Sequence, residues 1–266
     1  MEIWCHMSEQ NGRTLPTPKD DQDRKLLADV EEYGWHVVAV AADDEGPGFA
    51  YSVGFSHTFG HPEVIVFGLD TDIMIDIING IGDQIEAGEA LNDLDESADV
   101  LEGYNIFFRT VEPRHYPEYF GCALWFYQGP AFPALQCIWP DAEHHYPWHL
   151  ECEPGLAAQQ PLLAAETSWP FQAGKNRAIL TTKPVIQDQH PVLLVAHDDD
   201  GDWQFLCGTT NEPDDGQLVC LGDILDRDPT LAEVADLPEG WCAAREAVGA
   251  AWTRELMDPE EDEDES

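Results

Sequence analysis

The segment from Phe49 to Leu69, FAYSVGFSHTFGHPEVIVFGL, decides the fold of the first half of the chain. In its first eight residues large apolar side chains alternate with small ones, which is the period of two of a strand with one buried face. The polar stretch HTFGHP then separates this strand from a continuous apolar run, VIVF, which is typical of a strand covered on both faces. The segment therefore predicts a hairpin at the core of a sheet.

Helical and extended patterns flank this hairpin on both sides. Residues 19–33 place apolar side chains at helical spacing and stop at Gly34, and residues 35–42 are apolar and rich in valine, as in a strand. After the hairpin, isoleucine recurs every four residues from Ile73 to Ile85, which predicts an amphipathic helix. Downstream, the sequence predicts an acidic loop at 92–99, strands at 104–111, 122–127 and 134–139, and a short helix at 156–165.

The second half continues this mixture of strands and helices. It predicts strands at 178–182, 192–196, 203–207 and 218–221, short helices at 222–225 and 230–234, and a terminal helix at 243–256. We therefore expect an α+β protein, with an antiparallel or split-barrel-like sheet and flanking helices in its N-terminal domain, and a smaller α+β C-terminal domain. The expected parts are a flexible leader at 1–16, domains at 17–166 and 175–257, and an acidic disordered tail at 258–266.

The chain is strongly acidic. It has 53 Asp and Glu residues against 12 Lys and Arg, a formal net charge of -41 at pH 7 and an isoelectric point near 4.1. A field of this sign repels nucleic acids and anionic membranes and speeds association with cationic partners, so neither nucleic acid nor membrane binding is expected. Three interpretations stay open: solubility or adaptation to high salt, neutralisation of a basic protein partner, and a chelating surface.

The cysteines indicate a reducing compartment. The seven cysteines are odd in number, widely scattered and without a CxxC motif, a pattern that favours reduced thiols over a disulfide framework. The first residues, MEIWCHMSEQNGR, show no basic region followed by an apolar core, so no signal peptide is expected. These features predict a soluble, cytoplasmic protein.

The turn of the core hairpin carries a His-x3-His-Pro-Glu pattern, formed by His57, His61 and Glu63. On a helix this spacing would place both imidazole rings on one face to bind a metal, but Gly60 and Pro62 disfavour a helix here. We expect instead that these side chains bond amide groups of the turn and fix its shape, since half-buried polar groups need partners.

A second histidine-rich stretch supplies the candidate metal ligands His145, His149 and Cys152. Imidazole and thiolate groups suit zinc, although a fourth ligand would have to come from elsewhere in the chain. The alternative is an irregular aromatic loop whose histidines face solvent.

The small residues of the first hairpin strand, Ser52, Gly54 and Ser56, are candidate cofactor-binding positions. They would let a flat ligand approach the sheet, as in flavin-binding split barrels, but the isoleucine-rich helix could pack on the same face. The sequence has no GxSxG elbow, P-loop or GxGxxG motif after a strand, so no catalytic residue and no bound cofactor is expected.

The acidic run DDDGD contains Asp198, Asp199, Asp200 and Asp202. It lacks the spaced ligands and the terminal glutamate of an EF-hand loop, so a hairpin turn explains it better than a calcium site. Because these four side chains are anionic, they are candidate contacts for a basic protein partner.

Two segments of the chain resemble known families. GWHVVAV, YSVG…GHPE…FGL and ALQCIWPDAEHHYPW resemble DUF4262, a bacterial domain of unknown function, over about residues 20–165. The paired His144 and His145 depart from its usual pattern, so the resemblance implies no role for them. AILTTKPVIQDQHPVLLVAHDDDGDWQFLCG and DILDRDPTLAEVADLPEGWCAARE resemble a DUF2185-like module, whose relatives include proposed immunity proteins of bacterial toxin systems. Neither resemblance implies an active site.

These observations lead to one functional hypothesis and two alternatives. We expect a non-enzymatic, acidic binding protein, an immunity-like or antitoxin-like inhibitor that engages a basic toxin through its surface. The first alternative is a small-molecule or flavin-binding enzyme that uses the N-terminal sheet. The second is a halophile-type protein whose charge serves solubility alone.

Overall fold

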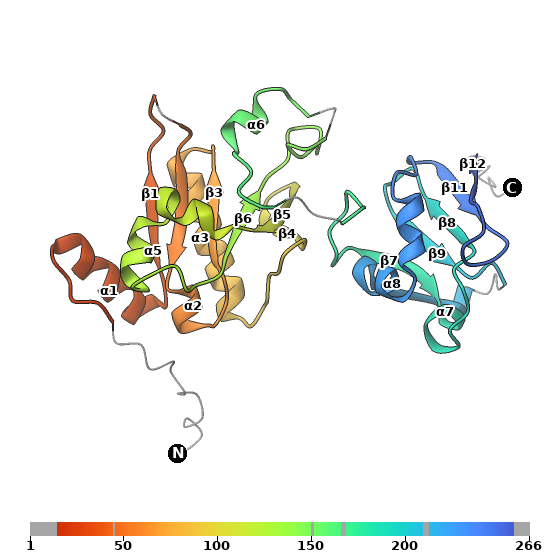
Figure 1. The fold of residues 1–266 in the computed structure, drawn as a ribbon, viewed down its shortest axis with the longest axis horizontal. Helices are drawn as coiled ribbons and strands as arrows, with labels where there is room; N and C mark the ends of the chain where they lie inside the picture. The colour runs from red at the N-terminus through yellow and green to blue at the C-terminus, as the bar shows by residue number, and fades with distance from the viewer. Residues whose placement is uncertain (1–14, 45, 150–151, 166–168, 210–212, 258–266) are drawn as a thin grey trace, which may run out of the picture. The chain divides into compact units, whose positions relative to one another are not determined.

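The protein is an α+β chain of two compact units, Met1–Thr167 and Ser168–Ser266 (Figure 1). The computed structural model describes residues 15–44, 46–149, 152–165, 169–209 and 213–257. Each unit contains one six-stranded sheet with helices against it, which confirms the predicted class. Both sheets are open, with an edge strand at each end, and this corrects the split-barrel alternative. The first fourteen residues of the predicted leader, and the predicted tail at 258–266, lie outside the described residues.

The sheet of the first unit has the strand order β1-β2-β3-β6-β5-β4. Its neighbouring strands are antiparallel except for β3 and β6, which are parallel, so the sheet is mixed rather than purely antiparallel. The described elements are, in chain order, α1 (Asp21–Tyr33), β1 (His36–Val40), β2 (Phe49–Val53), α2 (Phe55–Thr58), β3 (Glu63–Phe67), α3 (Thr71–Glu86), β4 (Glu96–Leu101), β5 (Tyr104–Thr110), η1 (Pro113–His115), α4 (Tyr116–Tyr119), α5 (Gly121–Phe126), β6 (Ala134–Ile138) and α6 (Leu156–Gln159).

The predicted core hairpin is confirmed, because β2 and β3 pair antiparallel with Tyr51 opposite Ile65. The first strand ends at Val53, earlier than the alternation suggests, and α2 begins two residues later. Gly54 between them has a φ of 124°, a conformation that residues with a side chain rarely adopt. A Cβ atom at this position would also lie 2.7 Å from the carbonyl oxygen of Gly34, so the backbone approaches too closely for any larger residue.

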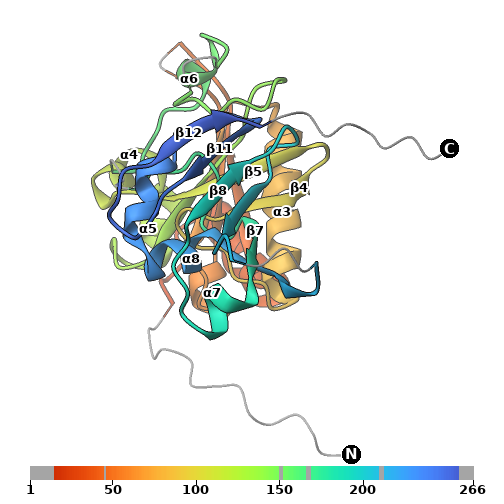
Figure 2. The same ribbon diagram turned by 90° about the vertical axis from the view of Figure 1, so that its right-hand side faces the viewer.

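Two hydrophobic layers cover the faces of this sheet. On one face, Tyr51 packs in a cluster with Leu26 of α1 and Phe120, next to α4 and α5. On the other face, Ala50 packs in a cluster with the isoleucines of α3, among them Ile77. Figure 2 shows α3 on one side of the strands and α4 and α5 on the other. The small-residue face of β2 therefore carries the isoleucine-rich helix.

Two predictions in the first unit are wrong. Residues 122–127, expected as a strand, form most of α5, in which Ala123 and Phe126 are about one turn apart and both buried in the core. Their apolar composition fits a strand or a helix equally, so the packing of both side chains on one side decides between them. The acidic loop expected at 92–99 contains the start of β4, an edge strand that pairs with β5.

The sheet of the second unit has the order β10-β7-β9-β8-β11-β12, and one of its faces packs against α8 and η3. Ile179 and Phe205 of the sheet meet Ile224 and Leu231 of these helices in one cluster. The described elements are β7 (Ala178–Thr182), α7 (Lys183–Gln187), β8 (Leu194–His197), β9 (Trp203–Leu206), η2 (Pro213–Asp215), β10 (Gly216–Cys220), α8 (Leu221–Arg227), η3 (Pro229–Val234), β11 (Trp241–Ala244) and β12 (Thr253–Leu256). Across the described parts of both units, no helix combines the length and apolar character needed to cross a membrane.

The terminal helix expected at 243–256 is wrong, because this segment forms most of the hairpin of β11 and β12. Its alanine-rich composition favours a helix locally. However, Ala243 pairs with Val195 of β8 and is fully buried, and Gly249 has a φ of 81°. Pairing with a strand distant in sequence therefore overrides the local preference. The hairpin predicted around the acidic run is confirmed, since β8 and β9 pair antiparallel on either side of it.

Candidate functional site

A fully buried carboxyl group lies at the centre of the first unit. Glu63 begins β3 and is 0% exposed. The hydroxyl of Ser52 donates to its Oε2 at 2.6 Å, and the backbone N–H groups of Gly54 and Ser56 donate to Oε1 at 3.1 and 3.0 Å. The hydroxyl of Tyr127 donates to the same Oε1. Both carboxyl oxygens are therefore occupied by donors from the surrounding chain.

This environment determines the acidity of Glu63 and its role. Burial raises the pKa of Glu63, and the hydrogen bonds from Ser52, Tyr127, Ser56 and Gly54 oppose that effect. A general base must reach the proton that it abstracts, and no face of this carboxyl group is exposed. Glu63 therefore joins the first strand of the hairpin to the second and to Tyr127, directly after α5, which is a structural role.

The same contacts show where the other predicted residues of the hairpin lie. Ser52, Gly54 and Ser56 hold Glu63, and Ser52 is fully buried, so this strip forms no open ligand surface. His61 Nδ1 lies 2.8 Å from the carbonyl oxygen of Pro62, and the backbone N–H of Leu91 donates to its Nε2 at 3.0 Å. Burial lowers the pKa of His61, which matches a neutral ring with one donor and one acceptor nitrogen.

His57, the third member of the predicted pattern, does not join this network. Its ring is exposed and stands edge-on to Phe126, with the ring centres 5.7 Å apart. The His-x3-His spacing therefore does not bring two imidazole rings to one point.

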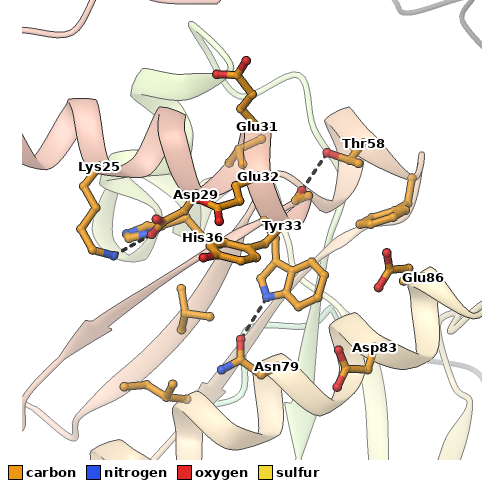
Figure 3. A pocket seen from close by; sticks show the side chains of 16 residues that line it. Lys25, Asp29, Glu31, Glu32, Tyr33, His36, Thr58, Asn79, Asp83 and Glu86 are labelled. Carbon is orange, nitrogen blue, oxygen red and sulfur yellow. Dashed lines mark hydrogen bonds and ion pairs between the residues drawn. The ribbon is translucent and has the colours of Figure 1, made fainter.

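An acidic groove of about 740 Å³ lies between α1, β1 and α3 on the surface of the first unit. Figure 3 shows Asn79, Asp83 and Glu86 along α3, across from Tyr33 and Glu32 at the end of α1. The residues that line the acidic groove are Lys25, Asp29, Val30, Glu31, Glu32, Tyr33, Gly34, Trp35, His36, Val37, Thr58, Phe59, Ile75, Asn79, Asp83 and Glu86.

The floor of the acidic groove is the indole of Trp35. This side chain is buried, and its Nε1–H donates to Asn79 Oδ1 at 3.0 Å. Gly82 of α3 permits the close packing, because a Cβ atom there would lie 2.6 Å from two ring atoms of Trp35. The hydroxyl of Thr58 donates to the carbonyl oxygen of Gly34 at 2.7 Å and fixes the adjoining wall. The floor is therefore a rigid aromatic surface.

The rim of the acidic groove is negatively charged. Five carboxylates line it against one ammonium group, that of Lys25. Lys25 Nζ and His36 Nδ1 both lie 2.6 Å from Asp29 Oδ2. Burial lowers the pKa of His36, although its bond to Asp29 opposes this, so at pH 7 the neutral ring predominates and offsets little of the charge. The four other carboxylates belong to exposed residues: Glu31, Glu32, Asp83 and Glu86.

Aromatic rings and carboxylates together make this groove suited to cations. Tyr33 is 58% exposed at the groove, and Phe59 is half-buried in its wall. An ammonium or guanidinium group is attracted by carboxylates and also by the faces of aromatic rings. The arrangement therefore favours a positively charged side chain over a neutral or anionic ligand.

The predicted metal ligands lie in a loop organised by Asp141. Its carboxylate accepts from the backbone N–H groups of Glu143, His145 and Glu153 at 2.8 to 2.9 Å. The rings of His145 and His149 are 6.0 Å apart, and Cys152 Sγ lies 3.7 Å from the carbonyl oxygen of Glu153. Among the described residues, no group of three or more His, Cys, Asp or Glu side chains is placed to hold a metal ion.

The acidic run of the second unit forms the turn between β8 and β9. Asp198 Oδ1 accepts from the backbone N–H groups of Asp200 and Asp202 at 3.2 and 2.8 Å, and Asp202 pairs with Arg177 at 3.2 Å. Asp199, Asp200 and Asp202 are exposed, so their carboxylates face solvent while Asp198 holds the turn.

The acidic groove was not predicted from the sequence. One usable signal was the stripe Ile75, Asn79, Asp83 and Glu86, whose members are three or four residues apart on the solvent side of a predicted helix. The aromatic pair around Gly34 was a second signal. Neither indicated that α1 and α3 both flank the edge strand β1.

The comparisons with known proteins concern the first unit. Residues 29–153 match the family model DUF4262, which is described as a domain of unknown function. This match supports the resemblance noted for the first half of the chain, and the DUF2185-like resemblance of the second half stays a prediction. No curated protein and no solved structure matches the chain. The matched segment contains Glu63 with its partners and every residue of the acidic groove except Lys25.

Proposed function

We propose that this protein is a non-enzymatic binding protein that engages a basic protein partner, with the acidic groove of the first unit as the principal contact. The observation that carries the proposal is the lining of this groove, which combines five carboxylates, the exposed ring of Tyr33 and the half-buried ring of Phe59 with a single ammonium group. A lysine or arginine side chain of the partner satisfies both features of that lining.

The charge of the whole chain supports the same partner class. A net charge of -41 creates a field that speeds encounter with a cationic protein and opposes encounter with nucleic acid. Each exposed ion pair contributes only about 0.2–1 kcal/mol, so affinity requires several contacts on a rigid surface. The buried Trp35 and its bond to Asn79 provide that rigidity.

The inhibitor role extends this proposal to a class of partner. The DUF2185-like resemblance of the second half, whose relatives include proposed immunity proteins, suggests a basic bacterial toxin. Hydrogen bonds occupy both carboxyl oxygens of Glu63, and the side chain is fully buried, so it has no access to a substrate. This favours binding over catalysis.

The test measures binding of a fluorescent hexa-arginine peptide to the full chain by anisotropy, at about 50 and about 300 mM NaCl. We expect the double variant Asp83→Asn/Glu86→Gln to bind about 3- to 10-fold more weakly at the lower salt. The matched control is Asp72→Asn/Asp76→Asn, which removes two exposed charges from the same helix outside the acidic groove.

Two results would contradict the proposal. Equal weakening by the control pair would show that only the total charge of the chain matters. An affinity indifferent to salt would remove the electrostatic basis of the contact.

A further inference from the structure

The strand β1 forms an open edge of the first sheet. Among the described residues it pairs with β2 alone, and no backbone hydrogen bond from another element reaches residues 36–40. Its sequence, HVVAV, contains no Asp, Glu, Lys or Arg, whereas the opposite edge strand, β4, contains Glu96 and Asp99. Ala39 and Val40 are exposed, so this part of the edge reaches solvent. Proteins usually protect an edge strand with charge, and an edge without it is suited to pairing with another extended chain.

The acidic groove lies along this same edge. Val38 packs in the core cluster on the α1 face of the sheet, and Val37 packs in the cluster on the α3 face. The two helices therefore flank β1 from opposite faces, and the groove between them opens on the start of the strand. Figure 3 shows Asp29 on the α1 side and Asp83 on the α3 side. Because side chains alternate along a strand, a strand added to β1 would point them toward α1 and α3 in turn.

The charged groups around this edge are predominantly acidic. The helix α3 contains no Lys or Arg, and the loop after β1 begins its charged run with Asp43 and Asp44. On α1 the basic side chains are already paired within the helix, Arg24 with Asp21 at 2.5 Å and Lys25 with Asp29 at 2.6 Å. Lys19, before the helix, is followed directly by an aspartate, the N-cap residue of α1.

Both helices also end with carboxylates at the groove. The last turn of α1 contains Glu31 and Glu32, and the last turn of α3 contains Asp83 and Glu86, with no basic residue in either turn. A helix C-terminus carries a partial negative charge and is stabilised by cations. The two helix ends therefore add to the attraction of the groove for a positive side chain, which the partner must supply.

We propose that β1 accepts an extended segment of the basic partner as an additional strand of the first sheet, with a lysine or arginine side chain of that segment in the acidic groove. Backbone hydrogen bonds supply affinity in this mode, and the carboxylates at the groove supply selectivity. This inference rests on the proposed function and adds the conformation of the bound segment. A second copy of the chain is a poorer occupant, because its β1 has no Lys or Arg for the groove and its net charge is also -41.

The probe is the peptide Arg-Lys-Val-Thr-Val-Lys-Arg, with acetylated and amidated ends, titrated into the full chain by calorimetry at about 50 mM NaCl. The first control peptide carries N-methyl groups on its three central amides, which removes these backbone donors and keeps every charge and side chain. The second control peptide has glutamate in place of every lysine and arginine.

We expect both control peptides to bind at least about tenfold more weakly than the probe. Hydrogen exchange of residues 36–40, followed by mass spectrometry, should slow with the probe and stay unchanged with the N-methylated peptide.

A matched pair of variants locates the edge. Ala39→Lys places a positive charge on β1 and should weaken binding of the probe about tenfold. Ala98→Lys makes the same change at an exposed alanine of the opposite edge strand, β4, and its affinity should stay within about twofold of the wild type. Unchanged thermal melting shows that both variants are folded.

Four outcomes would overturn the inference. Equal binding of the probe and the N-methylated peptide would exclude strand pairing, and if Asp83→Asn/Glu86→Gln still weakens both, the proposed function stands. Equal weakening by Ala39→Lys and Ala98→Lys would show that only the total charge matters. Binding of the probe that needs its backbone donors but is unaffected by Ala39→Lys would assign it to another edge. A concentration-dependent dimer that Ala39→Lys abolishes would make a second copy the occupant.

Discussion

The carboxyl group of Glu63 makes the stability of the first unit depend on pH. In the unfolded chain its pKa is near 4.5, and burial in the folded protein raises it. Between these two values the folded protein binds more protons than the unfolded chain, so the contribution of Glu63 to stability falls as pH rises. Glu63→Gln removes this titration and replaces one acceptor oxygen by a donor that faces other donors, at a cost of about 1–3 kcal/mol.

The difference in unfolding free energy between wild type and Glu63→Gln should therefore change with pH. Urea unfolding of wild type and Glu63→Gln at about pH 5 and about pH 7.5 should show a larger penalty at the lower pH. Titration of the many surface carboxylates is common to both proteins and cancels in the comparison. A penalty that grows with pH would mean that the hydrogen bonds outweigh burial and lower the pKa of Glu63.

Gly82 tests whether the floor of the acidic groove is rigid. A Cβ atom at Gly82 would lie 2.6 Å from the Trp35 ring, so Gly82→Ala must displace the indole and should destabilise the unit by about 1–3 kcal/mol. Gly80→Ala is the control, because a Cβ atom there meets nothing within 4 Å and the substitution should stabilise α3 by about 0.5–1 kcal/mol. Thermal melting shows whether each variant is more or less stable than the wild type. Equal shifts of the melting temperature in Gly82→Ala and Gly80→Ala would exclude the contact with Trp35.

At the level of the elements, Arg245 joins β11 to η3 in the second unit. Its buried guanidinium donates to Val192 O at 2.9 Å, to Thr230 Oγ1 at 2.7 Å and to the carboxylate of Asp228. It also lies 4.3 Å from the ring centre of Trp252. Burial alone would raise the pKa of Asp228, but the hydrogen bonds from Thr230 and Arg245 outweigh it and lower the pKa. The pair is therefore ionised in the folded protein at neutral pH.

Removal of one partner of this pair should be costly. Arg245→Met leaves the carboxylate of Asp228 without its cation and should lower the free energy of unfolding by about 3–5 kcal/mol. Arg254→Met is the control, because Arg254 pairs with Asp236 at the surface and such pairs contribute about 0–1 kcal/mol. Denaturant unfolding monitored by tryptophan fluorescence gives the free energy of unfolding of both variants. Similar losses of stability in Arg245→Met and Arg254→Met would show that the buried pair contributes no more than a surface pair.

For the whole molecule, 53 acidic residues stand against 12 basic ones, so repulsion between like charges destabilises the fold. We therefore expect the stability to rise with salt concentration. The screening length falls from about 30 Å at 0.01 M to about 10 Å at 0.1 M, so most repulsion within the chain disappears over this range. We expect the melting temperature to climb up to about 0.1–0.3 M NaCl and then to level off. A steep climb that continues to molar salt, measured by calorimetry, would favour salt adaptation over partner binding as the origin of the charge.

The sequence by itself determined the elements whose side-chain period is unambiguous. The β2 and β3 hairpin, the isoleucine-rich α3 and the hairpin of β8 and β9 follow from local patterns of apolar residues and turns. The turn residues His61 and Glu63 also stood out locally, and the structure shows their bonds to backbone groups nearby.

Only the tertiary structure decided the conformation of segments whose sequence fits either a helix or a strand. It also decided which residues distant in sequence come together in a site. α5 and the β11–β12 hairpin differ from prediction because side-chain burial and pairing with β8 outweigh weak local preferences. Tyr127 reaches Glu63 across 64 positions of the chain, and the acidic groove joins Lys25 of α1 to Glu86 of α3. Contacts of this kind are set by how helices pack on a sheet, which no local period of the sequence encodes.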